Sequence, residues 1–305
     1  MFRKLFFALI SFALLLSACA GPAAAPAVQT YTDGLGRAVK LVGPAQRVVS
    51  LAPSNTELLF AVGAGKQVVG RDDISDFPTE AKNLPSLGGF EKYNLEQLLA
   101  LKPDLVLLAE INNVELVKQM EDLGLNVYYL SNPKTIEDMY SNLSLVASLT
   151  GHEKDSASLI DSLKLRVAAV DEKMKAVASK PVVFYELDST DPAKPYTIGP
   201  NTFVDLLIMR AGGQNLTTAA GIQDSYPQVS VEQVVTTNPD LIILGDSMWG
   251  VSVESVGLRP GWEKLKAVSG QKVFPFDDNL VSRPGPRLVD GLETLAKLLH
   301  PELYK

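Results

Sequence analysis

The stretch Asn94–Leu108, NLEQLLALKPDLVLL, decides the fold, because a second copy follows in the other half of the chain as Ser230–Leu244, SVEQVVTTNPDLIIL. Each copy predicts a short helix, a stop enforced by Pro103 or Pro239, and a strand. The strands are continuous apolar runs, which are typical of parallel strands covered on both faces. Coincidence is the alternative, since the match is short and degenerate. We take the repeat to predict two related α/β units.

Strands and helices alternate around these two copies. In the first half, strand-like runs occupy residues 47–52, 67–70, 104–109 and 126–130, with helix-like runs between them. The alternation resumes at residue 181 and ends in a helix with an apolar face of Leu288, Leu292, Leu295 and Leu299. Before the first lobe, a DGLG turn at 33–36 predicts a hairpin. The pattern predicts two doubly wound α/β lobes.

Residues 154–179 lie between the lobes and carry an apolar residue at every third or fourth position: Ile160, Leu163, Val167, Val170, Met174 and Val177. This spacing predicts a helix of about 25 residues, about 37 Å long, that ends before Pro181. A coiled coil is the alternative, but it would have under four heptads and no sustained charge pattern. We expect a single long rigid helix that packs along both lobes, which span 29–153 and 180–305.

Residues 1–18 have the pattern of a signal peptide. Two basic residues precede a predominantly apolar run, Leu5–Leu16, which is shorter than the roughly 20 residues that a membrane span needs. The run leads into Leu16-Ser17-Ala18-Cys19, which resembles the lipobox of bacterial lipoproteins; an ordinary signal peptide with a chance cysteine is the alternative. Residues 19–28 are rich in Ala and Pro. We expect an exported protein with a lipidated Cys19, a flexible tether and a membrane anchor.

Composition excludes several classes of function. The chain has 28 basic and 35 acidic side chains, and removal of residues 1–18, which hold two basic ones, leaves a net charge of −9. Such an acidic balance argues against a nucleic-acid partner. Two histidines and one cysteine argue against a histidine or thiolate metal site, a cysteine protease and an intramolecular disulfide. Without a G-x-S-x-G, HExxH or Walker A motif, we expect no enzyme and no cofactor; an exported hydrolase is a remote alternative.

Helix caps supply candidate functional residues. Ser54–Glu57 precedes an apolar run as a capping box, which places Asn55 near the crevice that parallel strands form at their carboxyl ends. Glu96 and Glu232 occupy the second helical position in the two repeats. An acid there complements the helix dipole by about 0.3–1 kcal/mol. The alternative interpretation is that the two matched carboxylates form a docking surface.

Loop residues form a third group of candidates. Phe90, Tyr196, Tyr226 and Trp249 are aromatic residues in predicted loops, and Asp278, Arg283 and Arg287 gather after a predicted strand. Any one of them could simply pack in a loop. Together they favour a cleft for a large, partly apolar ligand.

With these motifs in place, the chain resembles the ABC-transporter binding proteins for vitamin B12, ferric siderophores and haem. The resemblance covers about residues 30–303 and rests on RVVSLAPSNTELLFAVGAG, SDFP, NLEQLLALKPD, YPQVSVEQ and SRPGPR. It implies two lobes joined by one long helix, a ligand cleft between them, and a monomer that delivers to a permease dimer driven by a cytoplasmic ATPase. It also implies that Glu96 and Glu232 dock into arginine pockets of the permease.

The resemblance is greatest to the vitamin B12 binders, so we expect cobalamin or a related corrinoid, with a ferric siderophore or haem as the alternative. Phe90 and Tyr226 stand where that pattern has tryptophans. Tyr196 replaces a phenylalanine and Ile74 a tyrosine. The expected ligand contacts are Asn55, Ile74, Phe90, Tyr196, Tyr226, Trp249, Asp278, Arg283 and Arg287.

Overall fold

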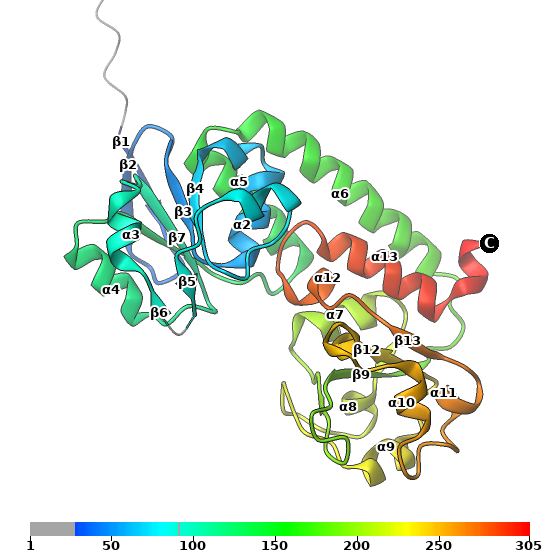
Figure 1. The fold of residues 1–305 in the computed structure, drawn as a ribbon. Coiled ribbons are helices and arrows are strands. Elements are labelled where there is room, and N and C mark those ends of the chain that lie inside the picture. Colours follow the sequence, from blue (N-terminus) through cyan, green and yellow to red (C-terminus); the bar gives the residue numbers. More distant parts are fainter. Residues whose placement is uncertain (1–27, 91) are drawn as a thin grey trace, which may run out of the picture.

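The computed structural model describes residues 28–90 and 92–305, and these form two α/β lobes (Figure 1). The predicted signal peptide, Cys19 and nearly all of the predicted tether lie outside the described residues. The predicted architecture of two α/β lobes is confirmed.

The N-terminal lobe is built on a parallel sheet with strand order β4-β3-β7-β8. Its strands are β3 (Val48–Ser50), β4 (Val68–Arg71), β7 (Leu105–Ala109) and β8 (Val127–Leu130). Its helices are α2 (Pro53–Ala61), α3 (Leu95–Ala100), α4 (Glu115–Asp122) and α5 (Ile136–Thr150), with short 3-10 turns η1 (Ala64–Gln67) and η2 (Thr79–Asn83). The predicted hairpin is present as β1 (Val28–Thr32) and β2 (Ala38–Val42), and a smaller one joins β5 (Gly88–Gly89) to β6 (Lys92–Tyr93).

The C-terminal lobe has a mixed sheet with strand order β10-β9-β12-β13, and β11 also pairs with β9. Its strands are β9 (Val182–Asp188), β10 (Tyr196–Thr197), β11 (Gln214–Asn215), β12 (Leu241–Leu244) and β13 (Val273–Pro275). Only β10 among them runs antiparallel to its neighbour. Its helical segments are α7 (Phe203–Arg210), α8 (Leu216–Ala219), α9 (Val231–Thr237), η3 (Gly245–Trp249), α10 (Val253–Gly257), α11 (Lys266–Ser269), α12 (Asn279–Ser282), α13 (Leu288–Leu299) and η4 (Pro301–Tyr304).

The sequence repeat is a structural repeat, because helices α3 and α9, and strands β7 and β12, begin at matching positions of the two copies. Lys102 and Asn238, one residue before each proline, both adopt left-handed backbone with φ of 48° and 49°. The aspartate after each proline accepts backbone N–H bonds at the start of the adjacent strand, Asp104 from Arg47 at 3.0 Å and Asp240 from Val182 at 2.9 Å. The motif therefore ends a helix and sets the register of a strand.

The lobes are joined by α6 (Glu153–Met174), which runs along the top of both in Figure 1. Its predicted apolar stripe is buried at Ile160, Leu163, Val167 and Val170, in one hydrophobic core with residues of both lobes. The predicted end at residue 179 is wrong, because the helix has 22 residues, about 33 Å. After the helix ends, the N–H groups of Ala176 and Val177 each donate to the carbonyl three residues earlier, as in a tight turn. The residue that precedes Pro181 is also disfavoured in helical conformation.

Candidate ligand-binding site

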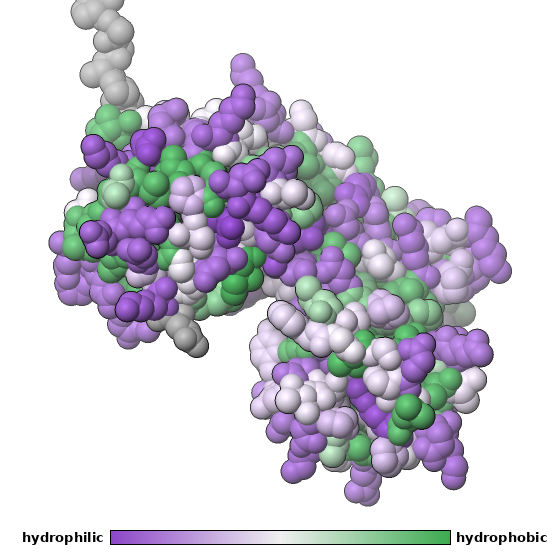
Figure 2. All heavy atoms as spheres, viewed as in Figure 1, coloured by the Kyte–Doolittle hydropathy of each residue, from purple (hydrophilic) through white to green (hydrophobic). Residues whose placement is uncertain are grey.

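A cavity of about 520 Å³ lies between the two lobes. The N-terminal lobe lines it with Ser54, Asp73, Ile74, Asp76, Phe90 and Ile111, and the C-terminal lobe with Met248, Trp249, Asp278 and Arg283, among others. We call it the inter-lobe cavity. Figure 2 shows the molecule hollowed between the lobes, on the side away from α6. The volume is within the range of small-molecule sites.

Large apolar side chains are exposed on the walls of this cavity. Trp249, at the end of η3, is 82% exposed, and Ile111 and Met248 are about half exposed. Ile74 and the partly buried Phe90 continue the apolar surface on the N-terminal lobe. Apolar groups that gather in a cavity instead of the core are typical of a binding site for a partly apolar ligand.

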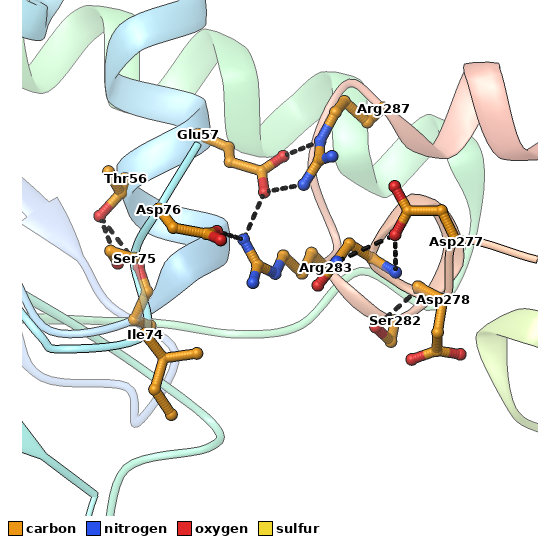
Figure 3. Close-up of polar contacts among 12 residues, drawn as sticks. Thr56, Glu57, Ile74, Ser75, Asp76, Asp277, Asp278, Ser282, Arg283 and Arg287 are labelled. Carbon is orange, nitrogen blue, oxygen red and sulfur yellow. Dashed lines mark hydrogen bonds and ion pairs between the residues drawn. The ribbon is translucent and has the colours of Figure 1, made fainter. Parts of the chain in front are cut away.

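A buried carboxylate holds the loop that carries Ile74. Asp72 follows β4, is fully buried, and accepts the N–H groups of Ile74 and Ser75, each at 2.9 Å. Burial raises the pKa of Asp72 although these bonds oppose the rise. Thr56 donates to the Ser75 hydroxyl at 2.8 Å and ties this loop to α2 (Figure 3). These bonds therefore hold the backbone at Ile74 in place on the wall of the cavity.

The predicted capping box at Ser54–Glu57 is wrong. Helix α2 begins at Pro53, so these residues lie inside the helix, and its N-cap residue Ala52 has no side-chain cap. Proline fits the first helical position because no N–H is needed there. Asn55 is fully buried and does not line the inter-lobe cavity, whereas its neighbour Ser54 does.

Glu57 makes contacts across the lobes instead of capping α2. Its carboxylate accepts two bonds from Arg287, at 2.6 and 2.8 Å, and lies 3.4 Å from Arg283 (Figure 3). Arg283 also donates to Asp76 at 2.6 Å. Burial alone would raise the pKa of Asp76, but the hydrogen bond and charge of Arg283 outweigh it and lower that pKa. Both predicted arginine contacts are therefore already engaged by carboxylates of the N-terminal lobe.

Asp278 lines the cavity from the C-terminal lobe. It accepts a bond from the hydroxyl of Tyr185, a buried residue of β9, at 2.6 Å. Burial raises the pKa of Asp278, and its bonds only partly offset that rise. The Tyr185 bond holds this carboxylate in place at the cavity wall.

The charged lining of the cavity is mainly acidic. Among the described residues that line it, Asp73, Asp76 and Asp278 face a lone guanidinium, that of Arg283. That guanidinium is already bound by Asp76 and Glu57. The excess of carboxylates would repel a negatively charged ligand. It would accept hydrogen bonds from a neutral or cationic ligand that is rich in N–H donors.

The structure does not bring all the predicted contacts together. Ile74, Phe90, Trp249, Asp278 and Arg283 line the inter-lobe cavity; Asn55, Tyr196, Tyr226 and Arg287 do not. The two tyrosines are exposed on adjacent segments, since Thr197 donates its N–H to Pro227 and Gly199 donates to Ser225.

Sequence reasoning did not assign several residues of the site. Met248 precedes the predicted contact Trp249, and Asp76 lies in the SDFP string, so adjacency was a usable signal for both. Ile111 and Glu57 gave no comparable signal, because their roles depend on tertiary contacts with the cavity and with the arginines.

Glu96 and Glu232 occupy the second positions of α3 and α9, as predicted, and both are exposed. Ser230 and Gln233 form a full capping box, whereas Asn94 accepts the N–H of Gln97 and its amide donates to the Gln97 side chain, so the box is not completed there. Figure 1 places α3 and α9 in the outer parts of different lobes. The two carboxylates are thus available on separate lobes.

Two features are absent from the described chain. Within residues 28–90 and 92–305, no helix is long and apolar enough to cross a membrane. The same residues contain no group of three or more His, Cys, Asp or Glu side chains that could hold a metal ion.

Two α/β lobes, a connecting helix and a ligand-sized cavity between the lobes define a two-lobed binding protein. The family model described as periplasmic binding protein matches residues 48–280, and the chain belongs to that family. It is 33% identical to an uncharacterized ABC transporter substrate-binding lipoprotein of Bacillus subtilis, over 90% of this chain and 87% of that protein.

Two further relatives have named ligands. A vitamin B12-binding protein of Pectobacterium atrosepticum is 31% identical, over 83% of this chain and 88% of that protein. A ligand-free periplasmic haem-binding protein of Roseiflexus sp. RS-1 has a similar structure, with a TM-score of 0.75 and 27% identity. That match covers 85% of this chain and 99% of the other.

Proposed function

We propose that the protein is the extracytoplasmic substrate-binding component of an ABC importer and carries cobalamin or a related corrinoid. The observation that carries this proposal is the chemistry of the inter-lobe cavity. Its exposed apolar walls include Trp249, and its carboxylates outnumber an arginine that is already paired. A corrin offers a broad apolar ring fringed with neutral amides, whose N–H groups are donors for carboxylates. The similarity to a vitamin B12-binding protein supports the same ligand.

A ferric siderophore or haem is the second candidate, favoured by the similarity to a haem-binding protein. Haem carries two propionates, and many siderophores bind iron through anionic groups. Such a ligand would have to take Arg283 from Asp76 and Glu57, and would then leave Asp76 without its cation and Glu57 with Arg287 alone. The charge balance therefore favours the corrinoid.

The proposal includes an anchor and a delivery partner. The monomeric protein is held at the outer face of the cell membrane, on the surface or in the periplasm, through lipidated Cys19. It delivers its ligand to a permease dimer with a cytoplasmic ATPase, and Glu96 and Glu232 bind arginines of the permease. Their exposure on separate lobes supports this, since two spaced charge pairs fix orientation and raise the association rate.

Calorimetric titration of the purified protein tests the ligand. Cyanocobalamin, haemin, a ferric hydroxamate and a ferric catecholate are titrated in one buffer. We expect 1:1 binding of cyanocobalamin with a sub-micromolar Kd and at least tenfold weaker binding of the others. Heat from an iron complex alone would instead establish the second candidate.

A further inference from the structure

A second cavity, of about 450 Å³, lies in the C-terminal lobe and shares a wall with the inter-lobe cavity. The end of β9 and the residues after it line it, with Asp188 and Ser189, and η3 contributes Asp246 and Trp249. Trp249 lines both cavities. A ligand that rests on this indole can therefore extend a substituent into the second cavity, which we call the Asp246 compartment.

Asp246 is a buried carboxylate with an unfilled hydrogen-bonding position. It is 3% exposed, and its Oδ2 accepts a bond from the Ser189 hydroxyl at 2.6 Å. Its Oδ1 is buried and has no hydrogen-bond partner among the described residues. A buried acceptor without a donor is costly, so such groups are rare unless a ligand or water completes them.

The charges near Asp246 leave its carboxylate without a cation of its own. Arg259, which is also near Ser189, forms a bidentate ion pair with buried Glu186, with one bond of 2.7 Å. Asp188 adds a further, exposed carboxylate to the wall. The compartment is therefore acidic, and it would repel a carboxylate but accept a neutral or cationic N–H donor.

We propose that the Asp246 compartment is a second part of the ligand site, where Asp246 accepts hydrogen bonds from a primary amide or amine substituent of a ligand that lies against Trp249. This inference rests on the proposed function and deepens it. It assigns Asp246 a role in specificity, because the compartment distinguishes an amide substituent from the isosteric carboxylate. A purely structural Asp246, tied to Ser189 alone, would not make that distinction.

The test compares cyanocobalamin with its monocarboxylic acid derivatives, in each of which one peripheral amide is hydrolysed to a carboxylate. Calorimetry at pH 7.5 measures Kd for the wild type, for Asp246→Asn, and for Asp161→Asn, a matched change on the exposed surface of α6. We expect at least one isomer to bind the wild type tenfold or more weakly than cyanocobalamin. Asp246→Asn should bring that isomer within about threefold of cyanocobalamin, and Asp161→Asn should leave the wild-type ratio unchanged.

The outcomes separate this inference from the proposed function. No binding of cyanocobalamin by the wild type would overturn both. Binding with the same isomer ratios in the wild type and in folded Asp246→Asn, checked by circular dichroism, would overturn the compartment alone. If Asp246→Asn does not fold, the wild-type series decides: equal affinity for all isomers overturns the compartment, and a loss confined to particular isomers supports it.

Discussion

Glu57 and Arg287 are 230 residues apart in the chain and form a bidentate ion pair between the two lobes, with bonds of 2.6 and 2.8 Å. Glu57 lies in α2, and Arg287 is the N-cap residue of α13. Their side chains are 1% and 13% exposed, and the Arg287 guanidinium also stacks 4.0 Å from the Phe77 ring centroid. This pair fixes the distance between α2 and α13 beside the inter-lobe cavity.

Arg287→Ala should reduce the free energy of unfolding by about 3–5 kcal/mol, because it leaves the buried Glu57 carboxylate with only the longer Arg283 contact. Urea unfolding measures the change. Adding Glu57→Gln to this variant should recover part of the loss, since the buried charge is then gone. Lys118→Ala, which breaks an exposed pair with Asp122, is the control and should cost less than about 1 kcal/mol. If Arg287→Ala and Lys118→Ala reduced the free energy of unfolding equally, that result would contradict a buried inter-lobe pair.

Trp249→Ala should weaken cobalamin binding by about 2–4 kcal/mol, because Trp249 is an exposed aromatic shared by both cavities. Tyr226→Ala should weaken it by about 1–3 kcal/mol, because Tyr226 stands where the vitamin B12 binders that the chain resembles have a tryptophan, although it lines neither cavity here. Leu258→Ala is the control, since Leu258 is 83% exposed and lines neither cavity. Calorimetric titration measures all three, and an unaltered Kd for Trp249→Ala would remove that residue from the site.

The sequence predicted the fold well where local chemistry decides it. The two prolines of the repeat marked real helix ends, and the apolar runs after them are the buried strands β7 and β12. The end of α6 could not be predicted in the same way. Val177 continues the apolar period and is partly buried, although the backbone has already turned, so periodicity alone extended the helix too far.

The site was less predictable, because its polar chemistry depends on contacts between distant segments. Glu57 has the spacing of a capping residue, and only its proximity to Arg287 in the folded chain shows its partner. The cavity is acidic because Asp73, Asp76 and Asp278 outnumber Arg283, which is itself paired with Asp76 and Glu57. Trp249 could be predicted as a candidate because an aromatic residue after a strand is a local signal. That it lines two cavities could not be predicted, because both cavities are formed by tertiary contacts.

Glu96→Ala combined with Glu232→Ala should leave ligand affinity unchanged and reduce uptake at least tenfold, because the carboxylates are proposed to bind the permease. Radiolabelled cobalamin uptake by cells and calorimetry measure the two effects. The matched control changes Glu115 and Glu254 to Ala, which are also first-turn acids, on α4 and α10 of the two lobes. Uptake lost equally in the control, or retained in the test variant, would refute specific docking.

Cys19→Ser should release the protein from membranes, because it removes the proposed thioether anchor. Fractionation of cells followed by immunoblotting measures the soluble share. Ser17→Ala is a suitable control, since it changes a neighbouring small residue and leaves Cys19 in place. A Cys19→Ser protein that remains in the membrane fraction would contradict lipidation at this residue.

Asp246 should make stability depend on pH in a defined direction. Burial raises its pKa from 3.8 to about 6, although the Ser189 bond opposes the rise. The folded protein therefore retains a proton that the unfolded chain has released, so this stabilisation is present below pH 3.8 and is lost as pH rises through 6. Above pH 6 the ionised carboxylate lowers the free energy of unfolding by about 2–3 kcal/mol, and Asp246→Asn should remove that loss.

Asp246→Asn should thus be more stable than the wild type at pH 7.5, and the difference should shrink as pH falls through 6 towards 4.5. Urea unfolding at several pH values measures it, with Asp161→Asn as the matched change at an exposed carboxylate. A difference that is independent of pH would contradict the raised pKa. A carboxylate that destabilises the protein at neutral pH, yet is needed to bind an N–H donor, is consistent with stability given up for ligand recognition.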